Sequence, residues 1–365
     1  MRPNTAVVAT ASLLLLALTG CVAPPASTTP TATPSPTPPP AASALTCHEL
    51  VPPELVAAAL EGADGVAVEP VPAVKDRDVF DGMLLEGVGG LPCSWRVGSG
   101  MPEYNAPSDW AYLRIDVLPG AADQWVPLPS GEGPSSDTRR LAGVDASFSA
   151  GDPGWAFSAP AGDAWVDVHL SAAGLTGSGS RFAGLDTGVV IDRLAAVAEA
   201  AFTTVQQAAP AQLEWPALQS APGEPDCAEV LDGPGLAAAL QLPEGSTIVV
   251  APVDAGTSAT AGLPGAVRAA AGVFQCRVEG EGLKWTTVTV APGLAPLVDR
   301  FAAPDGDAGF EPLALTGAPT DVRAVIQRDA DGAPSLADVS IAGTVYEVEG
   351  SAPAAIVQAI VDHAI

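Results

Sequence analysis

The chain has 365 residues, and its 15 Lys and Arg stand against 42 Asp and Glu, for a formal net charge of −27. A chain this acidic is repelled by nucleic-acid phosphates and by anionic lipid surfaces, so we expect no nucleic-acid partner and no charge-driven membrane binding. The acidity needs no role beyond keeping the chain soluble.

Residues 1–20 read MRPNTAVVATASLLLLALTG, with one charge at Arg2 and an apolar run over residues 6–18. This run is too short to cross a bilayer as a helix. A basic start, a short apolar core and small residues after it are typical of a secretory signal peptide. We therefore predict that residues 1–20 are removed from the mature protein.

The signal ends in LTGC, residues 18–21, which resembles the lipobox of bacterial lipoproteins. The resemblance implies cleavage before Cys21 and a diacylglycerol on the Cys21 sulfur. Two or more acyl chains hold a protein at a membrane durably, whereas one is marginal. We expect a lipid-anchored protein on the extracytoplasmic face of the cell membrane; the alternative is an ordinary secretory signal followed by a stray cysteine.

Residues 21–45 continue as CVAPPASTTPTATPSPTPPPAASAL, without a charge and rich in Pro, Thr and Ser. Such a segment buries too little apolar surface to fold, and its prolines keep it extended. We predict a tether between the lipid and the folded part of the chain.

Two stretches repeat each other without a gap: CHELVPPELVAAAL at 47–60 and CAEVLDGPGLAAAL at 227–240. The same features follow each of them in the same order: a second cysteine, an alternating segment that ends in Pro-Gly, and a final helical stretch. A repeat of this length indicates tandem domains. We assign residues 46–206 and 226–365 to two similar domains, joined by a Pro-containing linker over residues 207–225.

Within each copy the hydrophobic spacing changes along the chain. A helical segment follows the first cysteine, and apolar residues then alternate with polar ones, as Leu113, Ile115 and Val117 do with Arg114 and Asp116. Alternation predicts strands with one face in solvent, usually in antiparallel sheets. Helical spacing returns at 189–202 and 354–365. We therefore predict an α+β fold in which each domain is an antiparallel sheet with helices packed on one face.

Four cysteines remain besides Cys21, two in each copy. Paired cysteines in an exported chain predict disulfides, and four cysteines allow three connectivities. Duplication of a self-sufficient domain selects pairing within each copy, which joins Cys47 to Cys93 and Cys227 to Cys276. Closing such a loop stabilises a domain by roughly 2 to 4 kcal/mol.

The first copy, with a cysteine before a short helix ending in AAL and then Cys93-Ser94-Trp95, resembles a family of actinobacterial lipoproteins. Their shared cysteine-framed domain has no assigned function, and sensor-like extracellular domains of some actinobacterial kinases have a similar character. The second copy has Cys276-Arg277-Val278 at the equivalent place and matches more loosely. No catalytic residues come with this resemblance.

Catalytic and metal-binding patterns are weak in this sequence. His169, near Asp167 and Ser171, is the histidine best placed for a Ser-His-Asp arrangement, yet no G-x-S-x-G turn presents a serine. The segment DADG at 329–332 resembles the start of a calcium loop but lacks its later ligands, and a hairpin turn explains it better. We assign no catalytic residue, no metal and no cofactor.

A candidate binding loop lies in the first copy, in the stretch VGSGMPEYNAPSDW at 97–110, which carries Tyr104 and Trp110. The second copy is shorter here, and aromatic residues in an inserted loop often bind partners. The alternative is that Trp110 packs over the edge of the sheet.

These observations favour a non-enzymatic binding or sensing module of the cell envelope, whose partner is an envelope protein or a cell-wall component. One alternative is a carrier that encloses an apolar ligand in a cavity. Another is a cell-wall hydrolase, for which Asp167 and His169 or a pair of acids would have to meet in a cleft.

Overall fold

A computed structural model describes most of the chain after residue 42. The described residues are 43–62, 69–70, 79–98, 109–130, 133–151, 154–218, 226–253, 262–280, 283, 285–296, 298, 310–329 and 331–364. The signal peptide, Cys21, nearly all of the tether and Tyr104 lie outside them. Residues 42–365 form one compact unit.

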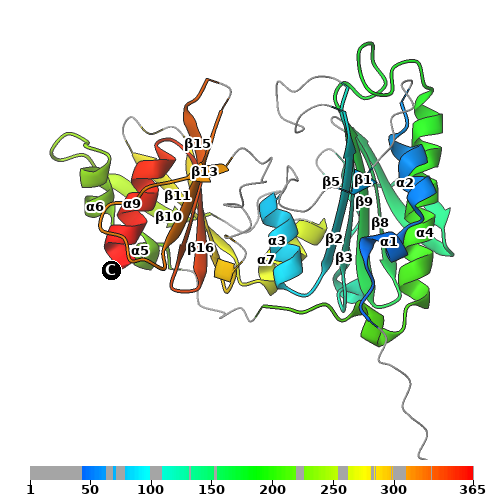
Figure 1. The fold of residues 1–365 in the computed structure, drawn as a ribbon, viewed down its shortest axis with the longest axis horizontal. Coiled ribbons are helices and arrows are strands. Elements are labelled where there is room, and N and C mark those ends of the chain that lie inside the picture. The colour runs from blue at the N-terminus through cyan, green and yellow to red at the C-terminus, as the bar shows by residue number, and fades with distance from the viewer. Residues whose placement is uncertain are drawn as a thin grey trace, which may run out of the picture. The chain divides into compact units, whose positions relative to one another are not determined.

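The fold is α+β and contains two larger antiparallel sheets, as the hydrophobic spacing predicted (Figure 1). The first sheet has the strand order β1-β2-β3-β9-β8-β7-β6. Its strands are β1 (Glu69–Pro70), β2 (Leu91–Val97), β3 (Ala111–Leu118), β6 (Thr138–Leu141), β7 (Val144–Gly151), β8 (Gly154–Ala161) and β9 (Ala164–Ala172). A small hairpin, β4 (Pro129–Ser130) and β5 (Gly133–Pro134), lies outside this sheet.

The second sheet repeats this order as β10-β11-β12-β16-β15-β14-β13. In both sheets the third strand therefore pairs with the last strand of the segment, which brings residues far apart in sequence into register. The strands are β10 (Ile248–Pro252), β11 (Phe274–Gly280), β12 (Thr286–Pro292), β13 (Phe310–Pro312), β14 (Arg323–Arg328), β15 (Pro334–Ile341) and β16 (Thr344–Gly350).

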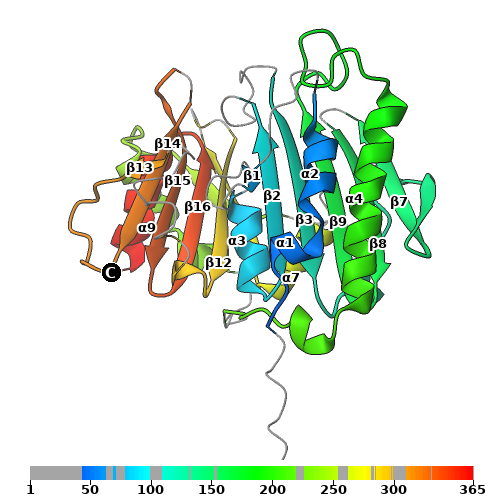
Figure 2. The same cartoon turned by 45° about the vertical axis from the view of Figure 1, so that its right-hand side comes forward.

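One face of the first sheet contributes to a large hydrophobic core. Its residues, such as Ile115, Phe157 and Val168, are fully buried together with apolar side chains of three helices. These helices are α1 (Cys47–Leu50), α2 (Pro53–Leu60) and α4 (Thr187–Gln207), and Figure 2 shows them in front of the sheet. In α4 Leu194, Ala198 and Phe202, three residues of the apolar stripe that the helical spacing predicted, are buried.

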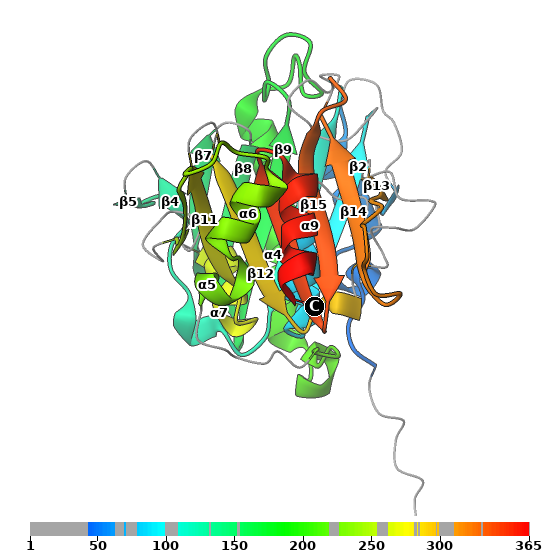
Figure 3. The ribbon, with the colours of Figure 1, turned by 90° about the vertical axis from the view of Figure 1, so that its left-hand side faces the viewer.

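A second core belongs to the second sheet. Val288, Val339 and Val348 are fully buried there with apolar residues of α9 (Pro353–Ala364), among them Ile356. Leu236 of α6 (Gly233–Ala239) joins the same core, which α5 (Cys227–Val230) also borders. Figure 3 shows α6 and α9 lying over this sheet.

Two further helices, which the hydrophobic spacing did not reveal, belong to a third hydrophobic cluster. They are α3 (Val79–Gly87) and α7 (Gly262–Ala270), which contact each other. The cluster gathers Leu84 of α3, Val267 of α7, Trp165 of the first sheet and Val345 of the second. It therefore joins the faces of the two sheets that point away from the cores already described.

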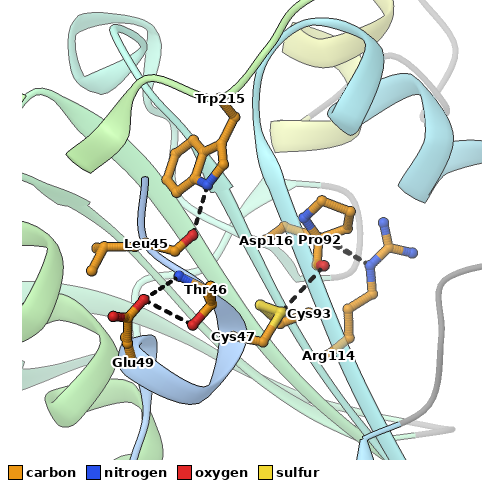
Figure 4. Close-up of a disulfide and its surroundings, with 9 residues drawn as sticks. All are labelled: Leu45, Thr46, Cys47, Glu49, Pro92, Cys93, Arg114, Asp116 and Trp215. Atoms are coloured by element: carbon orange, nitrogen blue, oxygen red, sulfur yellow. Dashed lines mark hydrogen bonds and ion pairs between the residues drawn. A yellow bond between two sulfur atoms is a disulfide. The ribbon is translucent and has the colours of Figure 1, made fainter. Parts of the chain in front are cut away.

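Both predicted disulfides are present, Cys47 to Cys93 and Cys227 to Cys276. Each ties the short helix at the start of a segment to the second strand of its sheet. Figure 4 shows the first bond beside the start of α1, where the Glu49 carboxylate accepts hydrogen bonds from the backbone N–H and the hydroxyl of Thr46, both at 2.8 Å. This is a helix-capping arrangement, and it holds the cysteine at the first turn.

The first part of the predicted linker lies against the first segment. Leu213 and Trp215 pack against its hydrophobic core. The Trp215 indole donates a hydrogen bond of 2.8 Å to the Leu45 carbonyl, which Figure 4 also shows. Residues 219–225 lie outside the described part of the chain. Among the described helices, none combines the length and the apolar character needed to span a bilayer.

Candidate functional site

The candidate site lies on the face of the first sheet opposite its core, where β3, β8 and β9 present polar side chains. The register places Arg114 beside His169, Asp116 beside Asp167, and Asp167 beside Ser158. Directly opposed residues of antiparallel strands project to the same side. We call these five residues the polar face of the first sheet.

The prediction that this side of the strands is in solvent was wrong. Arg114 is 8% exposed, Asp116 5% and Asp167 2%. The same face carries Trp165 and Leu118, whose side chains join the hydrophobic cluster of α3 and α7. A two-residue alternation reports which residues share a side, but not whether another element covers that side.

Asp167 is the best-supported carboxylate of the polar face. Its Oδ1 accepts hydrogen bonds from the Trp165 indole at 2.8 Å and from the Ser158 hydroxyl. Its Oδ2 lies 3.7 Å from Nε2 of His169. A buried carboxylate is tolerated when donors surround it in this way.

Ser158 is fully buried, and its hydroxyl is fully used. It donates to Asp167 and accepts from the indole N–H groups of Trp125 and Trp165, each at 2.9 Å. In acyl transfer a serine must instead face a histidine that takes its proton. Here His169 approaches Asp167 and not Ser158, so Ser158 is not placed as the nucleophile of a catalytic triad.

Arg114 and Asp116 form a buried ion pair within β3, with 2.8 Å between Nε and Oδ2 (Figure 4). Burial raises the pKa of Asp116 to about 6, although the Arg114 guanidinium opposes this rise. Asp116 therefore changes its charge closer to neutral pH than an ordinary carboxyl group does.

His169 connects the buried network to solvent. Its side chain is 41% exposed and lines an open pocket of about 220 Å³. Burial alone would lower the pKa of His169, but the hydrogen bond and charge of Asp167, with the charge of Asp116, outweigh burial and raise it. The other residues that line the pocket are Leu128, Pro129, Ser149, Gly151, Gly154, Trp155, Ala156 and Ser171.

The predicted binding loop is described only at its end. Trp110 is 5% exposed, which favours the alternative that it packs against the sheet rather than facing solvent. Tyr104 and the rest of the loop lie outside the described residues, so the loop as a binding element stays a prediction.

The second sheet carries two acids that sequence reasoning missed, Asp338 and Glu347, opposite each other on β15 and β16. Asp338 lies in the strand sequence SLADVSI, and an acid within such an apolar strand is the signal that could have drawn attention to it. The DADG segment forms a turn in which the Asp329 side chain accepts hydrogen bonds from the backbone N–H groups of Asp331 and Ala333. Among the described residues, no group of three or more His, Cys, Asp or Glu is placed to hold a metal ion.

Comparisons of the chain with protein-family models, with curated proteins and with solved structures found no match.

Proposed function

We propose that this chain is an extracytoplasmic lipoprotein, anchored to the cell membrane through Cys21, which binds an envelope protein or a cell-wall component and has no enzymatic activity. We further propose that residues 46–206 and 226–365 are tandem copies of one α+β domain. The main support for a binding role is the pocket beside His169, because there the buried polar network reaches solvent through the exposed His169 side chain.

The two disulfides support an extracytoplasmic location. Disulfides persist in oxidising compartments and are rare in the cytosol. Both bonds join cysteines that the sequence repeat places in equivalent positions. The location agrees with the signal sequence and with the lipobox-like LTGC that ends it.

The strand order supports the tandem arrangement. The seven strands of each sheet follow the same order, and each sheet begins after a cysteine-bearing helix. Duplication of one domain explains both the shared strand order and the equivalent disulfides, whereas independent origin would require each of them to arise twice.

The pocket suits a ligand with an anionic group. His169 offers an imidazole that is easily protonated, and Ser149 and Ser171 lie beside it. A protonated imidazole is a donor with a positive charge, so binding of an anionic group should strengthen as the pH falls through the pKa of His169. Cell-wall polymers and protein partners both carry carboxylates.

The alternatives have less support. For the cell-wall hydrolase, Asp167 is 2% exposed and its oxygens are held by Trp165 and Ser158, which disfavours Asp167 as a group that meets a substrate. The pocket beside His169 is open and partly polar, so it does not favour a carrier that encloses an apolar ligand.

Replacing Cys21 tests the anchor. We expect Cys21→Ser to move the protein from the membrane fraction to the culture medium, because the acyl chains can no longer be attached. Cell fractionation and immunoblotting measure this. A Cys21→Ser protein that stays with the membrane as firmly as the unchanged chain contradicts the lipid anchor.

A photo-crosslinking residue at Ser171 tests the binding role. We expect ultraviolet light to produce an adduct in living cells, measured as a mass increase of the purified chain, and we expect His169→Ala to reduce it. The same probe at Asp145 on β7, which is exposed and does not line the pocket, is the matched control. Equal labelling at both positions, or labelling that is insensitive to His169, would count against the pocket.

A further inference from the structure

The acids Asp338 and Glu347 form an unusual pair in the second sheet. They are direct partners of the antiparallel strands β15 and β16, so both side chains project to the same side. Asp338 is 1% exposed, and neither of its carboxylate oxygens has a hydrogen-bond partner in the described part of the chain. We call these two residues the acid pair.

Two negative charges cannot be held easily in this position. An unpaired buried charge is costly, and a second carboxylate beside it adds repulsion. Burial raises the pKa of Asp338 to about 8. Burial, followed by the charges of Asp338, Asp81 and Glu349, also raises the pKa of Glu347, and the charge of Arg268 opposes this rise.

The neighbouring strands offer the acid pair no charged partner in its row. Thr289 of β12 lies directly beside Glu347, and Val325 of β14 lies directly beside Asp338. The charge of Arg268 on α7 lowers the pKa of Glu347, and this guanidinium lies 3.0 Å from the Asp81 carboxylate of α3. A bound proton, rather than a neighbouring cation, therefore neutralises one of the two negative charges of the acid pair.

The acid pair also lies on the side of the second sheet that contacts α3 and α7. Val345, two residues before Glu347 on β16, belongs to the hydrophobic cluster of these two helices. The ion pair between Arg268 and Asp81 joins the same helices. The acid pair therefore lies on the same side of its sheet as the contact between the first and second segments.

We propose that Asp338 and Glu347 share a proton, and that loss of this proton at alkaline pH weakens the packing of α3 and α7 against the second sheet. The acid pair is then a proton-binding site that makes the contact between the two segments sensitive to pH. A protein outside the cytoplasm is exposed to the pH of the cell's surroundings, and this exposure rests on the proposed function. The proton-binding site itself does not depend on that function.

Because the pKa of Asp338 is raised in the folded chain, the stability of the chain should fall as the pH rises. The folded chain keeps the Asp338 proton up to about pH 8, whereas an unfolded chain releases it near the ordinary value of 3.8. Between these values the folded state binds more protons, so the free energy of unfolding decreases as the pH rises. Above the folded-state pKa this contribution no longer changes.

The first experiment measures the titration directly. We expect the side-chain carboxyl ¹³C resonance of Asp338 in the purified full chain to titrate near the folded-state value of about 8. An Asp338 that titrates in the ordinary acid range overturns the shared proton. This measurement needs no variant, so it decides the matter even where a substitution prevents folding.

The second experiment compares Asp338→Asn with the unchanged chain. The amide keeps the shape of the side chain but carries no charge at any pH. We expect Asp338→Asn to reduce the fall in midpoint denaturant concentration between about pH 5 and about pH 9, because the raised pKa values of Asp116 and His169 still contribute to it. Asp145→Asn, at an exposed position of the first sheet, should keep that fall. Equal pH dependence in the Asp338→Asn and Asp145→Asn proteins overturns the proposal.

Hydrogen exchange tests the consequence for the two helices. After correction for the intrinsic pH dependence of exchange, we expect the amides of α3 and α7 to lose protection above about pH 8 in the unchanged chain and to keep it in Asp338→Asn. Protection that does not change across the Asp338 titration shows that the proton does not control this contact. Neither result depends on lipidation or on a ligand at His169, so failure here is distinct from failure of the proposed function.

Discussion

The two sheets share a strand order and a disulfide, yet they treat buried acids in opposite ways. In the first sheet Asp167 lies beside Ser158, which donates a hydrogen bond to it. In the second sheet Glu347 lies beside Asp338, and the Asp338 oxygens have no hydrogen-bond partner among the described residues. In each sheet these residues belong to the pair formed by the last two strands of the segment.

This difference indicates that the hydrogen-bond donors around a buried carboxylate decide whether it is kept charged or protonated. The Trp165 indole and the Ser158 hydroxyl hold Asp167, and His169 lies next to it. Such a network supports a charged group and fixes its position. Without comparable donors, Asp338 keeps a proton instead, and the same location in the sheet becomes sensitive to pH.

Removing Asp167 should have the largest effect on stability. We expect Asp167→Ala to lower the free energy of unfolding by about 3 to 5 kcal/mol, because the buried Ser158 hydroxyl loses its acceptor and the Trp165 indole loses one of its two acceptors. Urea denaturation at neutral pH measures this loss. Asp145→Ala, which breaks an exposed ion pair with Arg140, is the control and should cost less than about 1 kcal/mol. Similar losses in the two variants would show that the network does not stabilise the first sheet.

Removing one disulfide at a time should have a smaller effect and tests the likeness of the two segments. We expect Cys47→Ala with Cys93→Ala, and Cys227→Ala with Cys276→Ala, each to cost about 2 to 4 kcal/mol, because the closed loops have similar lengths. Each double variant is the matched control for the other. Hydrogen exchange should show the loss mainly in the segment that carries the change, and equal deprotection of both segments would contradict two tandem domains.

Much of the fold follows from local patterns. The cysteine repeat predicted both disulfides, and alternation in Leu113, Ile115 and Val117 predicted a strand that the structure contains as β3. The α3 and α7 helices were missed. Gly82 lies within α3, and Pro264 and Gly265 lie within α7, which weakens the helical signal of both segments.

Less of the candidate site could be predicted from the sequence. Asp167 and His169 are two residues apart, so their common side of a strand was predictable. Ser158 and Arg114 reach them only through the pairing of β8, β9 and β3, which hydrophobic spacing does not specify. This face is covered by α3, by α7 and by Trp125, which lie elsewhere in the chain, and no local pattern contains these contacts.

The smallest expected effect concerns the link between Asp167 and His169. In Asp167→Asn an amide oxygen can still accept hydrogen bonds from Trp165 and Ser158, but the charge is gone. We therefore expect the pKa of His169 to fall, because the hydrogen bond and the charge of Asp167 are the largest effects that raise it against burial. A raised pKa in the folded chain stabilises it at low pH, and this stabilisation is lost as the pH rises through that pKa. The His169 side chain is 41% exposed, so solvent screens its charge. We therefore expect the part of the unfolding free energy that depends on His169 protonation to change by about 1 kcal/mol or less.

Titration of the His169 ring by NMR in the unchanged chain and in Asp167→Asn measures this link. Asp145→Asn again serves as the control, because it removes an exposed charge that is not among the groups acting on His169. An unchanged His169 pKa in Asp167→Asn would separate the imidazole from the buried network. The pocket would then be a surface feature that is independent of the buried network.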